Sequence, residues 1–346
     1  MKKQFPFFAF VSAGLVSAYM IVQLAVPVDP KKGMEEVHVE SGMTFSQAAR
    51  LLEADGFIRD SRLFTLLGRL TGADRRLRPG YYDLDGTMSP WAIFKMLRTA
   101  LLVQKEITVV EGDSLMEIRQ KMILRGLMNA SDFDRLAYGK AFLKSLGIDA
   151  PSIEGYLFPD TYRFPKGTSP EQVFTAMYKR LEEEFNPDLS ARAASLGLNL
   201  NSVLTLASII EKEAVVDPER PLISAVFYNR MKRGIPLQAD PTAVYGIKPI
   251  GEGVTKWDLL RKTKYNTYLI RGLPPGPIAS PGLKSIKAAL YPAKVDYLYF
   301  VSNHDGTHTF TSNYSDHLKA VENLKAKIES EAQQDASSGT DEKKKN

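Results

Sequence analysis

The chain has 346 residues, with an apolar fraction of 44% and a charged fraction of 25%. These fractions are typical of a folded protein and exclude a wholly disordered chain. The 45 basic and 40 acidic side chains give a net charge of +5, and no nucleic-acid-binding motif accompanies it, so nucleic acid is not an expected partner. The chain contains no cysteine, which excludes disulfides, a thiol nucleophile and cysteine-ligated zinc.

The first long feature is an apolar stretch over residues 5–28 that carries no charge. A helix of about 20 such residues crosses the hydrocarbon layer of a membrane. We therefore predict a short tail over residues 1–4, a transmembrane helix over 5–28 and a linker over 29–35. Lys2 and Lys3 favour a cytoplasmic N-terminus. The alternative is a cleaved signal peptide, for which the apolar run is too long. Either way, the rest of the chain is expected outside the cytoplasm.

Two related segments follow this stretch. Residues 37–45 align with residues 107–115, and the similarity continues beyond them. Each segment predicts an alternating strand, a glycine turn and a helix capped by Thr44 or Ser114. An internal repeat is first of all a structural signal. A duplicated scaffold without a ligand and a glycan-binding region both remain open.

The sequence changes character near residue 150, from the repeated region to long apolar helices and loops rich in Pro, Gly, Asn and Tyr. Further predicted elements are a strand over 80–84, a short helix from Ser89, an amphipathic helix over 169–185, a core helix over 201–214, a hairpin over 297–311 and a closing helix over 316–331. We predict an α+β fold, with the repeated region over 36–149, a mixed α/β domain over 150–331 and a disordered tail over 332–346.

The helix predicted over residues 201–214 carries the most informative acids. Glu211 shares its helical face with Leu204 and Ala207, whereas Glu213 points nearly the opposite way. Because the helix is apolar, the Glu211 carboxyl is expected to be partly desolvated and able to hold a proton near neutral pH, as a general acid must. The alternative is that these acids form a solvated helix end without a catalytic role.

A glycosidase normally pairs two carboxylates. Asp217, Glu219 and Asp240 are possible partners for Glu211, and none of the three stands out. His304 and His308 flank the predicted hairpin turn, but they lack a third ligand at a typical spacing. We therefore expect neither a metal ion nor a cofactor.

Four motifs together carry a resemblance to a known family. They are EGYLFPDTY at 154–162, ASIIEKE at 207–213, the stretch from VFYNRM to PLQADPT at 226–242, and the stretch from YNTY to GLPPGPI at 265–278. With these motifs the chain resembles the MltG/YceG-like family of endolytic murein transglycosylases, from the apolar N-terminal stretch to the closing helix.

The resemblance implies that Glu211, the first glutamate of its motif, is the catalytic acid and base. One carboxyl suffices for a lytic transglycosylase, because the muramyl 6-hydroxyl of the substrate attacks C1 in place of water. Asn229, Gln238, Asn266 and Tyr268 are predicted saccharide contacts, since amides and phenols bind hydroxyl and acetamido groups.

The resemblance also implies a LysM-like character for the repeated region and cleavage of nascent strands near the membrane, leaving 1,6-anhydroMurNAc ends. The expected partners are peptidoglycan glycan strands, the cytoplasmic membrane and peptidoglycan synthases. A hydrolytic muramidase and a non-catalytic peptidoglycan-binding anchor or divisome scaffold are the alternatives.

Overall fold

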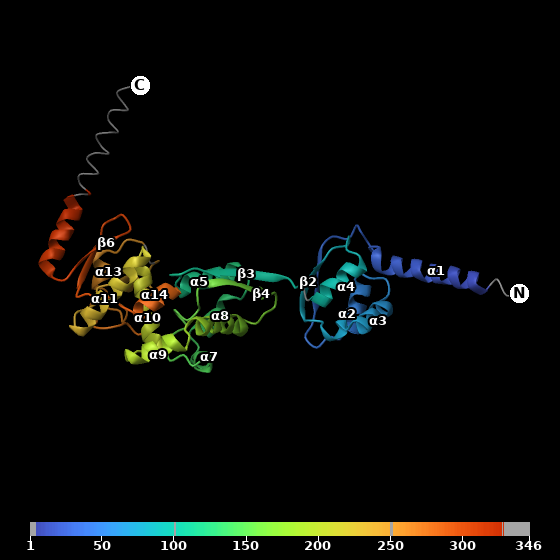
Figure 1. Cartoon of the computed structure of the whole chain (residues 1–346), viewed down its shortest axis with the longest axis horizontal. Helices are drawn as coiled ribbons and strands as arrows, with labels where there is room; N and C mark the ends of the chain where they lie inside the picture. Colours follow the sequence, from blue (N-terminus) through green and yellow to red (C-terminus); the bar gives the residue numbers. More distant parts are fainter. Residues whose placement is uncertain (1–4, 100–101, 250–251, 327, 329–346) are drawn as a thin grey trace, which may run out of the picture. The chain divides into compact units, whose positions relative to one another are not determined.

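The structure, a computed structural model, describes residues 5–99, 102–249, 252–326 and 328, and of residues 5–13 it describes the backbone only. Figure 1 shows the order of the elements along the chain. The described residues form helices and short two-stranded pairings rather than one large sheet. The fold is therefore of the predicted α+β class.

The chain divides into two compact units. Unit 1 contains the residues up to Glu106 together with Arg163–Thr168, and unit 2 contains Ile107–Tyr162 and the chain from Ser169 onwards. Strands β3 (Gln104–Val109) and β4 (Asp160–Pro165) pair with each other, so the chain passes from one unit to the other within this pairing. The division therefore falls elsewhere than the boundary predicted near residue 150.

Unit 1 contains two strands and four helices among the residues described. These elements are α1 (Phe5–Ala25), β1 (Glu35–Val39), α2 (Phe45–Ala54), α3 (Ser61–Thr71), the 3₁₀ turn Ala73–Arg75, β2 (Gly80–Leu84) and α4 (Pro90–Thr99). The strands β1 and β2 are antiparallel, with Val37 opposite Tyr82. Phe45, Phe64 and Phe94 form the aromatic centre of the core, with ring centroids 5.6 to 6.2 Å apart. Each such pair contributes about 0.5–1.5 kcal/mol beyond simple burial.

The end of α1 is held by one arginine of unit 1. The Arg59 guanidinium donates hydrogen bonds to the carbonyls of Val22, Val26 and Pro27, at 3.1, 2.7 and 2.6 Å. Val22 lies in the last turn of α1, and Val26 and Pro27 follow its last residue, so the arginine binds the carbonyls at the C-terminal end of the helix.

The predicted membrane span over residues 5–28 includes residues 5–13, whose side chains lie outside the described residues. Among the remaining residues, the apolar part of α1 runs from Gly14 to Ala25, and no single helix there is both long and apolar enough to cross a membrane.

The two related segments adopt the local structure that the sequence predicts. Thr44 caps α2 and Ser114 caps α5 (Leu115–Leu124), and each forms a capping box with the polar residue three positions later. One segment lies in unit 1, and most of the other lies in unit 2. The LysM-like character of this region stays a prediction. The helix after the second segment, over residues 130–137, is capped by Asn129.

Unit 2 is built around helix α10 (Leu200–Glu213). Its other elements are α6 (Ala130–Ala137), α7 (Lys140–Ser145), α8 (Pro170–Glu184), α9 (Pro187–Ser195), the 3₁₀ turn Asp217–Glu219, α11 (Arg220–Lys232), α12 (Asp240–Val244), α13 (Lys256–Leu260), α14 (Leu283–Leu290), β5 (Tyr299–Ser302), β6 (His308–Thr311) and a helix from residue 314 to 326. Helix α10 packs against α9, α11, α12 and α14. All residues from Val203 to Ile210 are fully buried, as expected for a helix that is apolar on every side.

The predicted helices over 169–185 and 201–214 and the predicted hairpin are confirmed as α8, α10 and the β5–β6 pair. The closing helix begins at residue 314, two positions earlier than predicted. The predicted disordered tail over 332–346 lies outside the described residues.

The packing of Gly68 in unit 1 yields a stability prediction. A Cβ atom added to Gly68 on α3 would lie 2.5 Å from the Phe45 ring. Although alanine is normally the better helix former, we expect Gly68→Ala to destabilise unit 1 by about 1–3 kcal/mol, because the core is overpacked. Thermal unfolding, with hydrogen exchange to locate the loss, measures this effect. Adding Phe45→Leu should recover part of the stability, and an unchanged or higher melting temperature for Gly68→Ala alone would contradict the argument.

Candidate active site

A cavity of about 430 Å³ in unit 2 lies beside the end of α10. Its lining includes Glu213, Arg230, Gln238, Asp240, Tyr268 and His308, which come from α10, α11, the α12 region, the loop before α14 and the β5–β6 hairpin. This size is within the usual range of small-ligand sites, and the lining is rich in hydrogen-bonding groups. We call it the Glu213 cavity.

Glu213 is the last residue of α10, and its carboxyl is half-buried. Burial raises the pKa of this carboxyl to about 8, and the nearby Asp240 carboxylate contributes to the increase, while a hydrogen bond from the Asp240 backbone opposes it. The carboxyl therefore carries a proton at neutral pH. A protonated carboxyl that lines a polar cavity is a suitable general acid.

Asp240 begins α12 and lies at the wall of the same cavity. Its carboxylate accepts a hydrogen bond from the Tyr268 hydroxyl. Of the three acids that the sequence suggested as a second carboxylate, Asp240 is the one among the lining residues. Asp217 pairs with Arg220 and Lys284, and the Glu219 carboxylate binds the ring and backbone nitrogens of His308.

Two buried polar atoms of the cavity lining have no hydrogen-bond partner within the described residues. They are Nε of Arg230 and Nδ1 of His317. Because both atoms are inaccessible to solvent, they lie behind the cavity surface and are not exposed to its interior.

The wall of the cavity near Gln238 has an unusual backbone. Gln238 has a φ of 54°, in the left-handed region that only a few non-glycine residues adopt. Its backbone N–H donates to the Thr267 carbonyl at 3.1 Å, and its side-chain oxygen accepts a hydrogen bond from Arg230. Two buried threonine hydroxyls, of Thr242 and Thr267, lie 2.7 Å apart and hold the same loops together. The loop conformation is thus fixed by several independent contacts.

Glu211 lies in different surroundings from Glu213. One carboxylate oxygen is 2.9 Å from Nη1 of Arg220, and the other accepts a hydrogen bond of 2.9 Å from the backbone of Gly282. The Glu211 side chain is 6% exposed and the Arg220 side chain 9% exposed. Glu211 does not line the Glu213 cavity. Both of its oxygens are thus engaged in buried contacts within the protein.

The four predicted saccharide contacts separate into two pairs. Gln238 and Tyr268 line the Glu213 cavity. Asn229 does not, and its amide nitrogen donates to the carbonyls of Val295 and Tyr297, at 2.9 Å each.

Asn266 is fully buried, and its amide nitrogen donates to the carbonyls of Leu259 and Arg261 at 3.0 and 2.8 Å. The geometry supports a structural role for Asn229 and Asn266. A saccharide contact by either amide stays a prediction.

The sequence analysis did not single out Arg230, Tyr299, Tyr314 or His317 as site residues, because only the fold brings them together. A weak signal existed for Glu213, which shares its helical face with Leu206 and Ile209. Both of those residues are fully buried. Since the opposite face of α10 is equally apolar, the pattern could not decide which glutamate faces a cavity.

Comparison with known proteins agrees with this architecture. Residues 37–323 match the model of the YceG-like family. A protein of Bacillus subtilis (strain 168) named endolytic murein transglycosylase is 33% identical over 321 residues, which cover 86% of this chain and 87% of the relative. A protein of the same name from Streptococcus pneumoniae serotype 2 is 28% identical, and the alignment covers 93% of this chain and 64% of that relative.

Among solved structures, a yceG-like protein from Listeria monocytogenes is similar to this chain. The TM-score is 0.58 and the sequence identity is 31%, with 83% of this chain and 98% of the Listeria chain covered. The family match extends over most of the chain and includes α10 and the lining of the Glu213 cavity. The chain belongs to the YceG-like family.

Proposed function

We propose that this protein is an endolytic murein transglycosylase that cleaves the bond between MurNAc and GlcNAc within peptidoglycan glycan strands. The names of its relatives support this function. The observation that carries it is the position of the Glu213 carboxyl at the wall of a polar cavity, where burial raises its pKa to about 8. A proton donor placed among groups that bind hydroxyls is what cleavage of a glycosidic bond requires.

In the proposed reaction, Glu213 donates its proton to the glycosidic oxygen, and the bond from that oxygen to C1 of MurNAc breaks. The departing GlcNAc leaves with a free hydroxyl. The muramyl 6-hydroxyl then forms a bond to C1, and the Glu213 carboxylate accepts its proton. The product is a 1,6-anhydroMurNAc end, no water is consumed, and Glu213 is again protonated. The negative charge of Asp240 stabilises the positive charge that develops at C1.

The choice of Glu213 differs from the sequence-based prediction of Glu211. The favoured acid lines the cavity, whereas Glu211 contacts Arg220 and the Gly282 backbone. Glu211 as the acid and base stays the alternative assignment. A direct comparison of variants at both positions decides between them.

We also propose that residues 5–28 anchor the chain in the cytoplasmic membrane, with the N-terminus inside. The charge-free apolar sequence supports this location. An enzyme held there meets nascent strands, and peptidoglycan synthases are its proposed neighbours. A LysM-like repeated region would lie between the membrane and the Glu213 cavity along the chain.

A hydrolytic muramidase is the second candidate, because Asp240 lies near Glu213 and two carboxylates can activate water. The test is digestion of purified glycan strands by the full chain, followed by mass spectrometry. We expect 1,6-anhydroMurNAc ends, which are one water lighter than reducing ends. Reducing ends would identify a hydrolase, and the absence of cleavage would favour a non-catalytic scaffold.

In the same assay, Glu213→Gln should lower the turnover rate by about 10²- to 10⁴-fold, because the variant has no proton to donate. Glu211→Gln is the matched control, with the same substitution on the same helix, and should keep most of the activity of the folded protein. Circular dichroism establishes that both variants are folded. The opposite ranking of the two variants would restore Glu211 as the acid.

The pH dependence should follow the protonation of Glu213. Because the reaction begins with proton donation, the rate should fall as the pH rises above about 8, the pKa of Glu213. Asp240 raises this pKa. Asp240→Asn should therefore lower it and move the alkaline limit of the rate profile to a lower pH. If the alkaline limit does not move in this variant, the limit is not set by the protonation of Glu213.

The buried pair of Arg220 and Glu211 is expected to act on stability. Arg220→Met leaves the Glu211 charge buried without its partner, which costs about 3–5 kcal/mol in comparable pairs. Urea unfolding should show this loss. Combining Arg220→Met with Glu211→Gln should recover a large part of it, since no unpaired charge remains. If Arg220→Met and the double variant have equal free energies of unfolding, Glu211 and Arg220 are not energetically coupled.

A further inference from the structure

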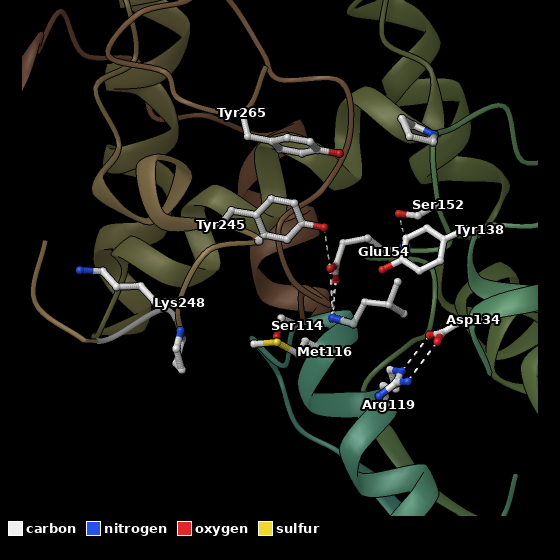
Figure 2. Close-up of a pocket in the computed structure, with 14 residues that line it drawn as sticks. Ser114, Met116, Arg119, Asp134, Tyr138, Ser152, Glu154, Tyr245, Lys248 and Tyr265 are labelled. Carbon is white, nitrogen blue, oxygen red and sulfur yellow. Dashed lines mark hydrogen bonds and ion pairs between the residues drawn. The ribbon is translucent and has the colours of Figure 1, made fainter. Parts of the chain in front are cut away.

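A second cavity of unit 2 takes no part in the proposed reaction. It has a volume of about 560 Å³ and lies between the start of α5, the segment around Glu154 and the chain that follows α12 (Figure 2). Its lining combines apolar side chains of Leu115, Met116 and Pro151 with three phenols, which belong to Tyr138, Tyr245 and Tyr265. We call it the Glu154 cavity.

The carboxyl of Glu154 lies at the centre of this lining (Figure 2). Glu154 is 2% exposed. Its two oxygens accept hydrogen bonds of 2.9 and 3.0 Å from the backbone N–H of Leu115, and one of them also accepts the Tyr245 hydroxyl at 2.9 Å. Burial raises the pKa of Glu154 to about 7, although these hydrogen bonds favour the charged form. A carboxylate can accept about four hydrogen bonds, so capacity remains for a donor from a ligand.

Within the described ranges, no lysine or arginine forms an ion pair with the Glu154 carboxyl. The two basic residues of the lining are each paired with another acid: Arg119 binds Asp134 through two hydrogen bonds of 2.8 and 3.0 Å, and Lys248 binds Asp258 at 2.7 Å.

The nearby Glu117 carboxylate adds further negative charge, because it contributes to the raised pKa of Glu154. Because Arg119 and Lys248 are already paired with other acids, Glu154 is left without an ion-pair partner among the described residues. A cationic group of a ligand would supply that partner.

The aromatic part of the lining suits the same kind of ligand. The rings of Tyr245 and Tyr265 lie 4.6 Å apart with a tilt of 48°. Phenol rings attract ammonium groups through their faces. The lining contains neither Asn nor Gln, in contrast to the Glu213 cavity with its Gln238. An alkyl ammonium group, which binds both carboxylates and the faces of phenol rings, fits this lining.

We propose that the Glu154 cavity binds the side-chain ammonium of the diamino acid in a peptide stem of the glycan strand. This inference rests on the proposed function, because it assigns a second feature of the same substrate. The aliphatic chain of the diamino acid contacts Leu115, Met116 and Pro151, and its ammonium group binds Glu154. Crosslinking turns this amine into an amide in the acceptor stem, so the site favours strands whose stems are still free.

Helix α12 relates this site to the proposed catalytic site. Asp240 at its start lines the Glu213 cavity, and Tyr245, directly after its last residue, lines the Glu154 cavity. A helix of this length rises about 8 Å, so the two cavities adjoin opposite ends of one short element.

The first test measures binding of a probe to the full chain by calorimetry or NMR. The probe is Nα-acetyl-lysine methylamide, and the same compound acetylated at Nε is its control. We expect the amine to bind and the acetylated compound to bind at least tenfold more weakly. Glu154→Gln should remove this preference. Glu171→Gln, an exposed glutamate of α8 outside the cavity, makes the same charge change and should preserve it.

The control compound keeps the result decisive even if Glu154→Gln does not fold, because it tests the site without altering the protein. Equal binding of the two compounds to the unaltered chain would overturn the proposal. So would a preference for the amine that persists in folded Glu154→Gln.

The second test measures cleavage of strands that carry free or acetylated stem amines. Acetylation should raise KM several-fold for the unaltered chain and should have no effect on Glu154→Gln. An equal KM for both substrates would overturn the role in substrate choice. If no strand is cleaved at all, the proposed function fails, whereas the binding test still decides whether the cavity takes an amine.

Discussion

The burial of helix α10 is the constraint on which unit 2 depends. Its residues from Val203 to Ile210 are inaccessible to solvent, because α9, α11, α12 and α14 all pack against it. A helix surrounded in this way cannot rotate or shift without opening the core. The two acids at its end are thereby held in fixed positions on different faces of the helix. Glu213 lines a polar cavity, and Glu211 contacts Arg220 and the backbone N–H of Gly282.

A single residue, Lys212, separates these glutamates, yet their surroundings give them different chemistry. A carboxyl that is half-buried near another carboxylate retains its proton, and one that is bound by a guanidinium is held as part of the core. The same distinction applies to the two cavities of unit 2. The Glu213 cavity is lined by groups that bind hydroxyls. The Glu154 cavity is lined by phenols, aliphatic side chains and one carboxyl that has no ion-pair partner among the described residues. One substrate with a sugar and an amine would use both.

Local patterns predicted local structure well. The caps at Thr44 and Ser114, the amphipathic α8 and the β5–β6 hairpin all follow from spacings within a few residues. The division into two units was not predictable in the same way, because it depends on β3 pairing with β4, about 50 residues further along the chain. The roles of Asn266 and Glu154 depend on which distant groups each contacts. Periodicity on one helix likewise could not rank Glu211 and Glu213.

The left-handed conformation of Gln238 has a consequence for the evolution and engineering of this protein. Such a backbone costs about 1–3 kcal/mol for a residue with a side chain, and glycine would remove that cost. Glycine would also delete the amide that receives Arg230 and would loosen a wall of the cavity. A search for thermostable variants would therefore select a change here that weakens function, as happens when a protein trades stability against activity.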